Sequence, residues 1–415
     1  MQLLALSRWK ILGTEMSHSF VVSPLQHDTY SAVWTRPPLS GAFVQQGAES
    51  MIGSAKSEPG KLTYGFIDSM DLPTGITEKI PVMIAQGAED GPTFFLTANI
   101  HGAELTGIAT IHEFVTESLA RELKGTVVAI PTLNPSGLRR LQRSPEFDER
   151  DPNRLFPEGM FAKEEEDEDE DKKYPKPYEQ IAKKIYAYME QYADFLIDFH
   201  NHGLRSIPYV ILDRVFYKST AQKNGADQLF EQLKAMVESF GVTTCVEFPA
   251  KRYLKKKLHR SVSGAALNNL RIPAFTAELG ANSILDPQIV AGSIKGVRNV
   301  LKWAGLLDGA QEEITEFPIL RPRERIRLHD HPRAKHSGLI NFLVEPGDRV
   351  TKGQPVARIT DIFGRPLGDG YIRTENDGYI IGLKTGTTVY PNDAIATIGI
   401  RNDAPLVVSI PPKKG

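Results

Sequence analysis

The sequence predicts an α/β protein whose main sheet is mainly parallel or mixed and is flanked by helices, followed by a C-terminal all-β barrel-sandwich domain. Strand-like apolar runs alternate with amphipathic helical patterns over roughly residues 60–305, which is typical of α/β layers. Near residue 310 the helical patterns stop, and short strand-like segments separated by Gly, Pro and Asp begin. We therefore divide the chain into an N-terminal arm (1–50), a main domain (51–310) and a β-domain (311–415).

Each element of the main domain is predicted from its apolar pattern. Strands are short apolar runs bounded by turn residues, whereas helices place apolar residues three or four positions apart. The expected strands are 80–85, 94–100, 126–130, 194–200, 242–248 and 274–278. The expected helices are 105–123, 178–192, 220–239, 261–270 and 287–304.

The β-domain contains an internal repeat. Residues 344–359 resemble residues 383–398 at a constant offset of 39 residues, with Gly, Ala and the apolar positions in register. Two such half-motifs indicate a small β-sandwich with pseudo-twofold symmetry, similar to the biotinyl/lipoyl-like barrel-sandwich. Carrier domains of that type place a modified lysine in the hairpin between the halves, and no lysine lies between Lys352 and Lys384. We therefore expect a non-carrier domain.

Composition and charge exclude several classes of protein. The 415 residues carry a formal net charge of -2, so no global electrostatic argument favours nucleic acid or an acidic membrane as a partner. The first 20 residues lack the pattern of a signal peptide, and no stretch approaches the ~20 apolar residues needed to cross a bilayer. Cys245 is the single cysteine and lies in an apolar run, so we expect a buried structural thiol and no multi-thiolate zinc site. A cytoplasmic enzyme or binding protein is the expected class.

Three polar segments interrupt the main domain. Residues 134–157 form a long loop rich in Pro, Arg and Asp, and loops of this length within a domain are often functional. Residues 164–171 are eight consecutive acidic residues, which predict a solvated, mobile insertion. The basic run at 251–257 favours a solvated surface over a site that attracts an anionic substrate.

The motif His-Gly-Ala-Glu, which begins at His101, lies where a strand gives way to a helix. His101 and Glu104 can both face one metal ion from such a junction. His200 ends another apolar strand and would supply a third ligand, since neighbouring parallel strands end at the same edge of a sheet. Two histidines and one glutamate, with a position left for water, are a ligand set of catalytic zinc. His202 shares a strand face with His200 and is the stronger alternative, whereas His112 falls on the helix after the motif.

Two carboxylates would support such a metal site. Asp198 lies on the same face of its strand as His200 and could orient that ligand. Glu278 ends another apolar strand, where a carboxylate could take the proton of an attacking water and pass it to the leaving amine.

The long loop offers donors for a substrate. Arg143 could pair with a substrate carboxylate or stabilise an oxyanion, and Asn153 and Arg154 could add a neutral donor and a second guanidinium. Arg139 and Arg140 are nearby candidates whose pattern is more typical of a solvated surface.

Taken together, these motifs resemble a known superfamily. In chain order they are His101-x-x-Glu104, Asn134-Pro135-x-Gly137, Asn153-Arg154-x-Phe156-Pro157, Asp198-x-His200 and Thr276-x-Glu278-x-Gly280. Over roughly residues 60–305 the set resembles the zinc carboxypeptidase superfamily and, within it, the succinylglutamate desuccinylase/aspartoacylase family, whose members commonly carry an appended β-domain. The resemblance implies the zinc carboxypeptidase-like fold and a zinc hydrolase domain over residues 51–310.

The same resemblance implies roles for individual residues. One Zn2+ per chain would be held by His101, Glu104 and His200. Asn153 and Arg154 would bind a substrate carboxylate, Arg143 would polarise the scissile carbonyl, and Glu278 would be the general acid/base. The stretch between Arg143 and Asn153 is longer than in the compact acylases of the family.

The expected function is zinc-dependent hydrolysis of an amide bond in a small carboxylate-bearing substrate such as an N-acyl amino acid. A metallocarboxypeptidase acting on short peptides shares the metal site and is one alternative, and a non-catalytic binding protein on the same scaffold is another. The substrate-closing tyrosine of the family has two candidates by position, Tyr253 and Tyr209. The partner is thus expected to be a small molecule, and edge strands in the β-domain are compatible with a homo-oligomer.

Overall fold

The computed structural model describes residues 51–162, 174–203, 205–384 and 386–410, together with four short strands near the N-terminus. The chain divides into two units, Met1–Val33 and Trp34–Gly415. In the first unit, two antiparallel pairs form, β1 (Ala5–Leu6) with β4 (Ser19–Phe20) and β2 (Trp9–Ile11) with β3 (Thr14–Met16). The rest of the predicted N-terminal arm and the acidic run at 164–171 lie outside the described residues.

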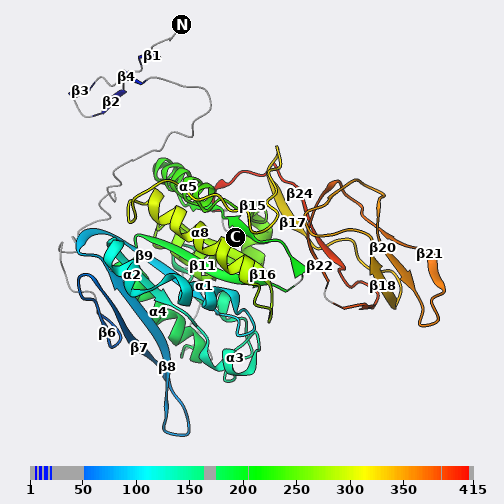
Figure 1. Ribbon diagram of the computed structural model, residues 1–415, viewed down its shortest axis with the longest axis horizontal. Coiled ribbons are helices and arrows are strands. Elements are labelled where there is room, and N and C mark those ends of the chain that lie inside the picture. The colour runs from blue at the N-terminus through cyan, green and yellow to red at the C-terminus, as the bar shows by residue number, and fades with distance from the viewer. Residues whose placement is uncertain are drawn as a thin grey trace. The chain divides into compact units, whose positions relative to one another are not determined.

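A large mixed sheet forms the centre of the second unit (Figure 1). Its strands in the main part of the chain are β7 (Lys61–Asp71), β8 (Thr77–Gln86), β9 (Glu89–Ala98), β10 (Lys124–Ile130), β11 (Phe195–His202), β13 (Tyr209–Leu212), β15 (Thr243–Val246) and β16 (Ala274–Ala281). Strands β10, β9, β11 and β16 are parallel neighbours, and β13 continues the sheet antiparallel to β16. The long hairpin β7–β8 extends it beyond β10. A small hairpin, β5 (Met51–Ile52) and β6 (Ala55–Lys56), packs beside β7. The predicted α/β fold class is confirmed.

Helices cover both faces of this sheet. They are α1 (Thr106–Phe114), α2 (Glu117–Glu122), α3 (Pro135–Arg140), α4 (Pro177–Tyr192), α5 (Thr220–Phe240), α6 (Ala250–Lys255), α7 (Val262–Asn268) and α8 (Pro287–Trp303). Gly107 of α1 lies against Phe199, whereas the Ser263 hydroxyl of α7 lies 2.9 Å from that of Thr276. Thr276 is the cross-strand partner of Asp198. Because Asp198 and Phe199 are consecutive in a strand and point to opposite faces, α1 and α7 lie on opposite sides of the sheet.

The glycine at position 107 allows α1 to approach the sheet closely. A Cβ atom there would lie 2.5 Å from the Cβ of Phe199 and 2.9 Å from that of Ala98. We expect Gly107→Ala to lower the free energy of unfolding by about 1–3 kcal/mol, despite the better helix propensity of alanine. At Gly225, on the exposed face of α5, an added Cβ would have no neighbour within 4 Å beyond the backbone of the helix itself, so Gly225→Ala should raise the free energy of unfolding by about 0.5–1 kcal/mol. Urea denaturation of both variants measures the two effects, and a gain in both would contradict the close packing of α1.

Two local expectations differ from the structure. The helix expected over 105–123 is divided into α1 and α2, because the β-branched Val115 and Thr116 adopt extended backbone angles and the Thr116 side chain accepts a hydrogen bond from the Leu119 amide, capping α2. The loop expected over 134–157 begins with α3, whose first turn is capped by the Asn134 side chain.

The C-terminal part is built from short strands that pair mostly antiparallel with one another. They are β17 (Ile326–His329), β18 (Gly338–Phe342), β19 (Arg349–Val350), β20 (Pro355–Thr360), β21 (Pro366–Arg373), β22 (Gly378–Leu383), β23 (Thr388–Val389), β24 (Ala396–Arg401) and β25 (Val407–Ser409). The repeat places β18, β19 and β20 in correspondence with β22, β23 and β24. These halves exchange partners, because β19 pairs with β22 and β23 pairs with β18. This reciprocal pairing agrees with the pseudo-twofold symmetry expected from the repeat.

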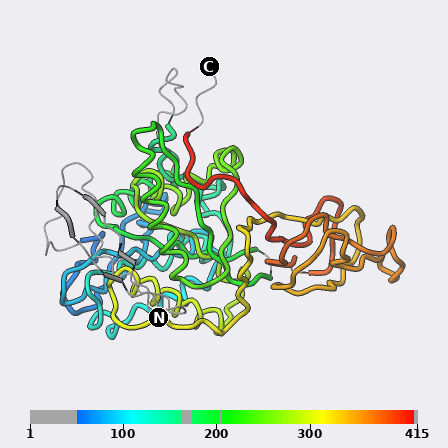
Figure 2. The backbone as a smooth tube through the Cα atoms, turned by 90° about the horizontal axis from the view of Figure 1, so that it is seen from above, coloured from blue at the N-terminus to red at the C-terminus, as the bar shows by residue number. Residues whose placement is uncertain are grey.

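The large sheet continues past residue 310. Strand β17 pairs parallel with β15 and antiparallel with β24, and β22 then pairs with β24. Strand β12 (Arg205–Ser206) pairs with β22. The C-terminal segment returns to the main body, where β25 pairs with β14 (Val215–Tyr217), as the red end of the tube in Figure 2 shows. Fully buried Arg214 donates hydrogen bonds to the carbonyls of Glu247, Phe248 and Pro405 and so joins this returning segment to the main sheet.

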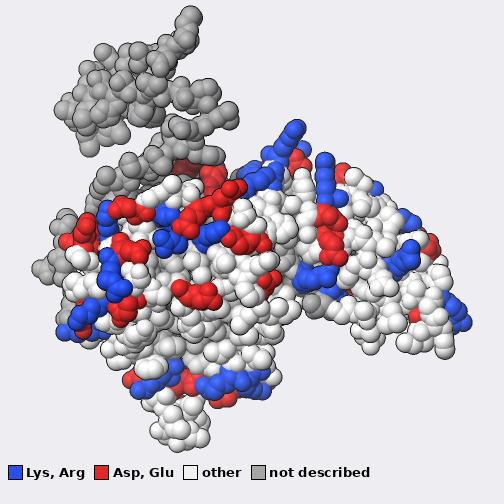
Figure 3. Space-filling model, in the orientation of Figure 1, with Lys and Arg blue, Asp and Glu red and all other residues white. Residues whose placement is uncertain are grey.

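The distribution of charged side chains on the surface and the burial of the single cysteine agree with what the sequence predicted. Acidic and basic side chains are interspersed over the face seen in Figure 3, in keeping with the formal net charge of -2. Cys245 is buried, and burial raises the pKa of its thiol. Among the helices in the described ranges, none has the length and apolar character needed to cross a membrane.

Asp213, which follows β13, makes the stability of the fold depend on pH. Burial and the charge of Glu247 raise the pKa of Asp213 to about 8, whereas an unfolded-chain aspartate has a pKa of about 3.9. The folded protein therefore holds a proton that the unfolded chain releases, and the free energy of unfolding falls as the pH rises through this window. We expect the Tm to decrease between about pH 5 and about pH 8, and Asp213→Asn to flatten that decrease. Thermal melts of both proteins test this, and identical pH slopes would refute it.

Candidate active site

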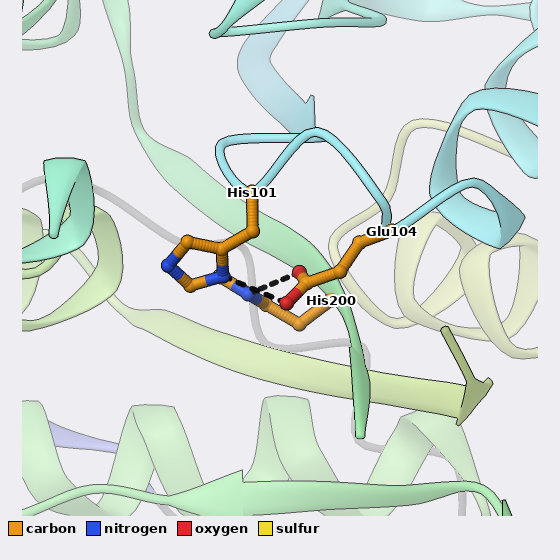
Figure 4. Close-up of side chains that lie close together, drawn as sticks. All are labelled: His101, Glu104 and His200. Atoms are coloured by element: carbon orange, nitrogen blue, oxygen red, sulfur yellow. Dashed lines mark hydrogen bonds and ion pairs between the residues drawn. The ribbon is translucent and has the colours of Figure 1, made fainter. Parts of the chain in front are cut away.

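The three predicted metal ligands converge at the carboxyl ends of two neighbouring parallel strands. His101 and Glu104 lie in the loop between β9 and α1, and His200 lies near the end of β11 (Figure 4). Because β9 and β11 are parallel neighbours, their ends meet at one edge of the sheet. All three side chains are buried, with exposed fractions of 3–4 %. Their ligand atoms lie within 4.8 Å of one another, as one metal ion requires.

Both histidines present the same ring nitrogen to Glu104. The Nδ1 atom of His101 lies 2.7 Å from one carboxylate oxygen of Glu104, and the Nδ1 atom of His200 lies 2.8 Å from the other. Burial disfavours the charge on Glu104, but the two imidazoles outweigh it and lower the pKa of Glu104 to about 2. The carboxylate thus stays ionised between two nitrogen donors.

The opposite nitrogen of each ring is held by a further carboxylate. The Nε2 atom of His200 lies 2.7 Å from Asp198, as the sequence predicted, and that of His101 lies 3.0 Å from Asp151. Thr97 donates a hydrogen bond to Asp198 and fixes it in turn. Metal-binding histidines characteristically donate the second ring N–H to a carboxylate, which leaves the first nitrogen free for the ion. The donor set and its supports therefore fit one metal ion bound through both Nδ1 atoms and Glu104.

Asn99 shapes the loop that carries two of these ligands. It has a φ of 55°, and its side-chain amide donates to the backbone carbonyls of His101, Gly102 and Glu104. Asparagine tolerates this left-handed conformation better than most residues. Sequence reasoning missed both Asn99 and Asp151, although an asparagine at a strand end just before the motif was a usable signal.

Glu278 lies beside the ligand cluster on β16. It is the cross-strand partner of His200, so both side chains lie on the same face of the sheet. Its Oε2 atom is buried and has no hydrogen-bond partner among the described residues. Burial raises the pKa of Glu278 to about 7, with the nearby histidines opposing the shift and Glu104 adding to it. A carboxyl group with such a pKa can both accept and release a proton near neutral pH.

The predicted substrate-binding residues border the cluster. The Asn153 amide nitrogen lies 3.3 Å from Nε2 of His200, and its oxygen accepts a hydrogen bond from the amide of Val262. Arg143 reaches the cluster through a 2.7 Å ion pair with Asp151, on a side chain that is half exposed. Arg154 donates to the backbone carbonyl of Asn153.

The competing candidates from the sequence lie apart from the ligand cluster. His202 lies 2.8 Å from the Tyr209 hydroxyl and 3.2 Å from that of Thr397, so both of its ring nitrogens have partners outside the ligand cluster. The remaining candidates are placed as follows: His112 is exposed on α1, Arg139 pairs with Glu78, Arg140 is exposed, and the Tyr253 hydroxyl donates to Asp213. Both candidate closing tyrosines, Tyr209 and Tyr253, are fully buried.

Comparisons with known proteins agree with this geometry. Residues 90–304, slightly more than half of the chain, match the model of the succinylglutamate desuccinylase/aspartoacylase catalytic domain. The N-alpha-acetyl-L-2,4-diaminobutyric acid deacetylase of Halomonas elongata is 25% identical over 329 residues, which are 77% of this chain and 85% of the relative.

Solved structures share the fold. The product-bound ectoine utilization protein EutE (DoeB) of Ruegeria pomeroyi has a TM-score of 0.62 at 21% identity, over 82% of this chain and 95% of that one. A succinylglutamate desuccinylase/aspartoacylase of Rhodobacter sphaeroides has a TM-score of 0.62 at 20% identity, over 83% and 96% of the two chains. These likenesses extend past residue 304, so they include C-terminal strands as well as the matched catalytic domain.

Proposed function

This chain belongs to the succinylglutamate desuccinylase/aspartoacylase family, and from this premise we propose that it is a zinc-dependent amidohydrolase that removes the acyl group from a small N-acyl amino acid. The observation that carries the proposal is the buried cluster of His101, Glu104 and His200, with each histidine backed by a carboxylate and with Glu278 beside it. A zinc ion held by only these three protein ligands would have a position left for water, which is typical of a catalytic rather than a structural zinc site.

Different residues of the site would carry out different steps of amide hydrolysis. A zinc ion held by His101, Glu104 and His200 would act as a Lewis acid and would increase the nucleophilicity of water. Glu278 accepts the proton of the attacking water and returns it to the leaving amine, because its raised pKa suits both transfers. The oxygen of the water bonds to the acyl carbon as the water loses one proton, the C–N bond breaks, and the leaving nitrogen gains that proton, so a carboxylic acid and a free amino acid result.

Two arginines and one neutral amide side chain would orient the substrate. Arg154 and Asn153 would bind the carboxylate of the amino acid, for which a guanidinium provides a fork of donors. Arg143 would stabilise the charge that develops on the acyl oxygen. The ion pair of Arg143 with Asp151, which also contacts His101, supports a position next to the metal ligands.

The relative from Halomonas elongata gives the first substrate to test. It is named a deacetylase of N-alpha-acetyl-L-2,4-diaminobutyric acid. We propose N-acetyl amino acids as the substrate class, with N-acetyl-L-2,4-diaminobutyrate the first compound in a panel that also includes anionic and neutral N-acyl amino acids and dipeptides. Amine release, measured together with zinc content, tests the proposal. Turnover of dipeptides alone would identify a metallocarboxypeptidase, and zinc-free protein without turnover would favour a binding protein.

A further inference from the structure

A chain of hydrogen bonds leads from Tyr209, the cross-strand neighbour of the proposed general base Glu278, to the C-terminal strands. We call it the relay chain, and its members in order are Tyr209 on β13, His202 at the end of β11, Thr397 on β24 and Asp330 after β17. The Tyr209 hydroxyl lies 2.8 Å from Nδ1 of His202, and Nε2 of His202 lies 3.2 Å from the Thr397 hydroxyl. The Thr397 hydroxyl donates to Asp330 at 3.2 Å. The relay chain thus joins β11 and β13 of the main domain to β24 of the C-terminal part.

The direction of each bond follows from the last acceptor. The Asp330 carboxylate accepts the hydrogen bond of the Thr397 hydroxyl, which has a single proton to donate. The Thr397 oxygen must therefore accept from Nε2 of His202. His202 therefore carries its proton on Nε2, and Nδ1 accepts from the Tyr209 hydroxyl. Each member has one role, and no proton is left without an acceptor.

Tyr209 is the member of the relay chain that lies next to Glu278. Its backbone partner on the neighbouring strand is Glu278, so the two side chains stand next to each other on one face of the sheet. The ring is fully buried in an apolar cluster with Ile207, Cys245 and Ile381, and the cluster also draws on the C-terminal strands. The hydroxyl is the one polar atom of this side chain, so its bond to His202 sets the position of the ring.

The C-terminal strands support the other end of the relay chain. Strand β12, directly after His202, pairs with β22, and the amide of Ile207 donates to the carbonyl of Ile381. Thr397 is buried, with an exposed fraction of 1%. Ser206 and Ile207, which lie between the third metal ligand and Tyr209, are therefore paired with residues that come more than 150 positions later in the chain.

We propose that the relay chain is a positioning device, through which the C-terminal strands hold the Tyr209 ring against Glu278 and thereby fix the geometry of that carboxylate. The proposal rests on the proposed function only for the role of Glu278. Tyr209, His202 and Thr397 are positioning residues, and each acts through the next.

The test compares Thr397→Val and Tyr209→Phe with Thr397→Ser in the zinc-loaded full-length protein. With N-acetyl-L-2,4-diaminobutyrate as substrate, we expect kcat to fall on the order of tenfold in the first two variants, with KM little changed, because a misplaced catalytic group slows the reaction more than it weakens binding. Thr397→Ser keeps the hydroxyl and should keep kcat. The double variant should lose little more than either single one, since both break the same chain.

A matched control separates positioning from stability. Thr374, directly after β21, is another buried threonine of the C-terminal part, and its hydroxyl donates to the carbonyl of Asn376, outside the relay chain. Thr374→Val should lower the Tm about as much as Thr397→Val but leave kcat unchanged. Equal kcat in Thr397→Val, Tyr209→Phe and the wild type, beside an inactive Glu278→Gln, would overturn the positioning role and leave the proposed function intact.

A spectroscopic measurement tests the relay chain without any turnover. Histidine 15N NMR of the full-length protein should show His202 protonated on Nε2, with its signals assigned by their loss in His202→Gln. Thr397→Val should shift those signals, and Thr374→Val should not. Protonation of His202 on Nδ1, or no response to Thr397→Val, would overturn the relay chain even if the protein hydrolysed none of the N-acyl amino acids.

Discussion

Replacing Glu278 by glutamine should lower kcat/KM by about 10²–10⁴-fold while the protein keeps its full complement of zinc. The reason is that glutamine retains the shape of the side chain but accepts no proton from water, and general acid–base catalysis typically contributes this factor. Glu278 lies beside the ligand cluster on β16 without belonging to it, so metal binding should be preserved. Steady-state kinetics and elemental analysis of the same preparation measure both quantities.

Glu113→Gln is a matched control for this variant, because Glu113 is exposed on α1. It should keep wild-type kcat/KM. The wild-type pH profile gives a second check. Burial raises the pKa of Glu278 to about 7, and a bound cation would lower it, so kcat/KM should fall with decreasing pH at or below about pH 7. Near-full activity in Glu278→Gln would show that another group moves the proton.

His101→Ala should abolish both zinc binding and hydrolysis. One of three protein ligands is removed, and Glu104, buried with an exposed fraction of 3%, loses one of its two imidazole partners. Leaving a buried charged group with incomplete pairing typically costs about 1–3 kcal/mol or more, so the Tm should fall as well. Metal analysis, activity and thermal melting of the purified variant measure the three effects.

His112→Ala provides the comparison for the metal-site variant. His112 is the histidine nearest in sequence, and it is exposed on α1. It should leave zinc content, activity and Tm near the wild-type values. If His101→Ala also left all three unchanged, the metal-dependent hypothesis would be wrong and a binding function on this scaffold would be favoured.

The residues that could be predicted from the sequence are those whose side chain suits a metal site and whose position follows from a local strand pattern. The His101 motif follows a continuous apolar strand, and His200 ends another, so parallel pairing alone is enough to bring them together. Asp198 could be placed beside His200 from strand alternation, and the structure has the contact. The fold class followed from the same alternation of strands and helices.

What escaped prediction depends on contacts between distant segments. Asp151 reaches His101 from a loop 50 residues away, and no periodic pattern reports such a contact. The sequence likewise did not predict that the large sheet continues from β15 into β17, because an apolar strand pattern does not identify the strand with which it pairs. The division into α1 and α2 results from the extended backbone conformation of Val115 and Thr116. The sequence did not predict it, because the apolar spacing over 105–123 is that of one continuous helix.

The late pairing of β17 with β15 and of β25 with β14 has a consequence for biosynthesis. All the proposed ligands and the proposed base have been synthesised once residue 278 is added, yet β15 gains its outer neighbour at Ile326 and β14 gains its own at Val407. Since chains begin to fold from the N-terminus as they are made, a nascent protein carries a bare edge at β15 until Ile326 is made and one at β14 until Val407 is made. The growing chain should therefore depend on chaperone protection at each of these edges until its partner strand is added.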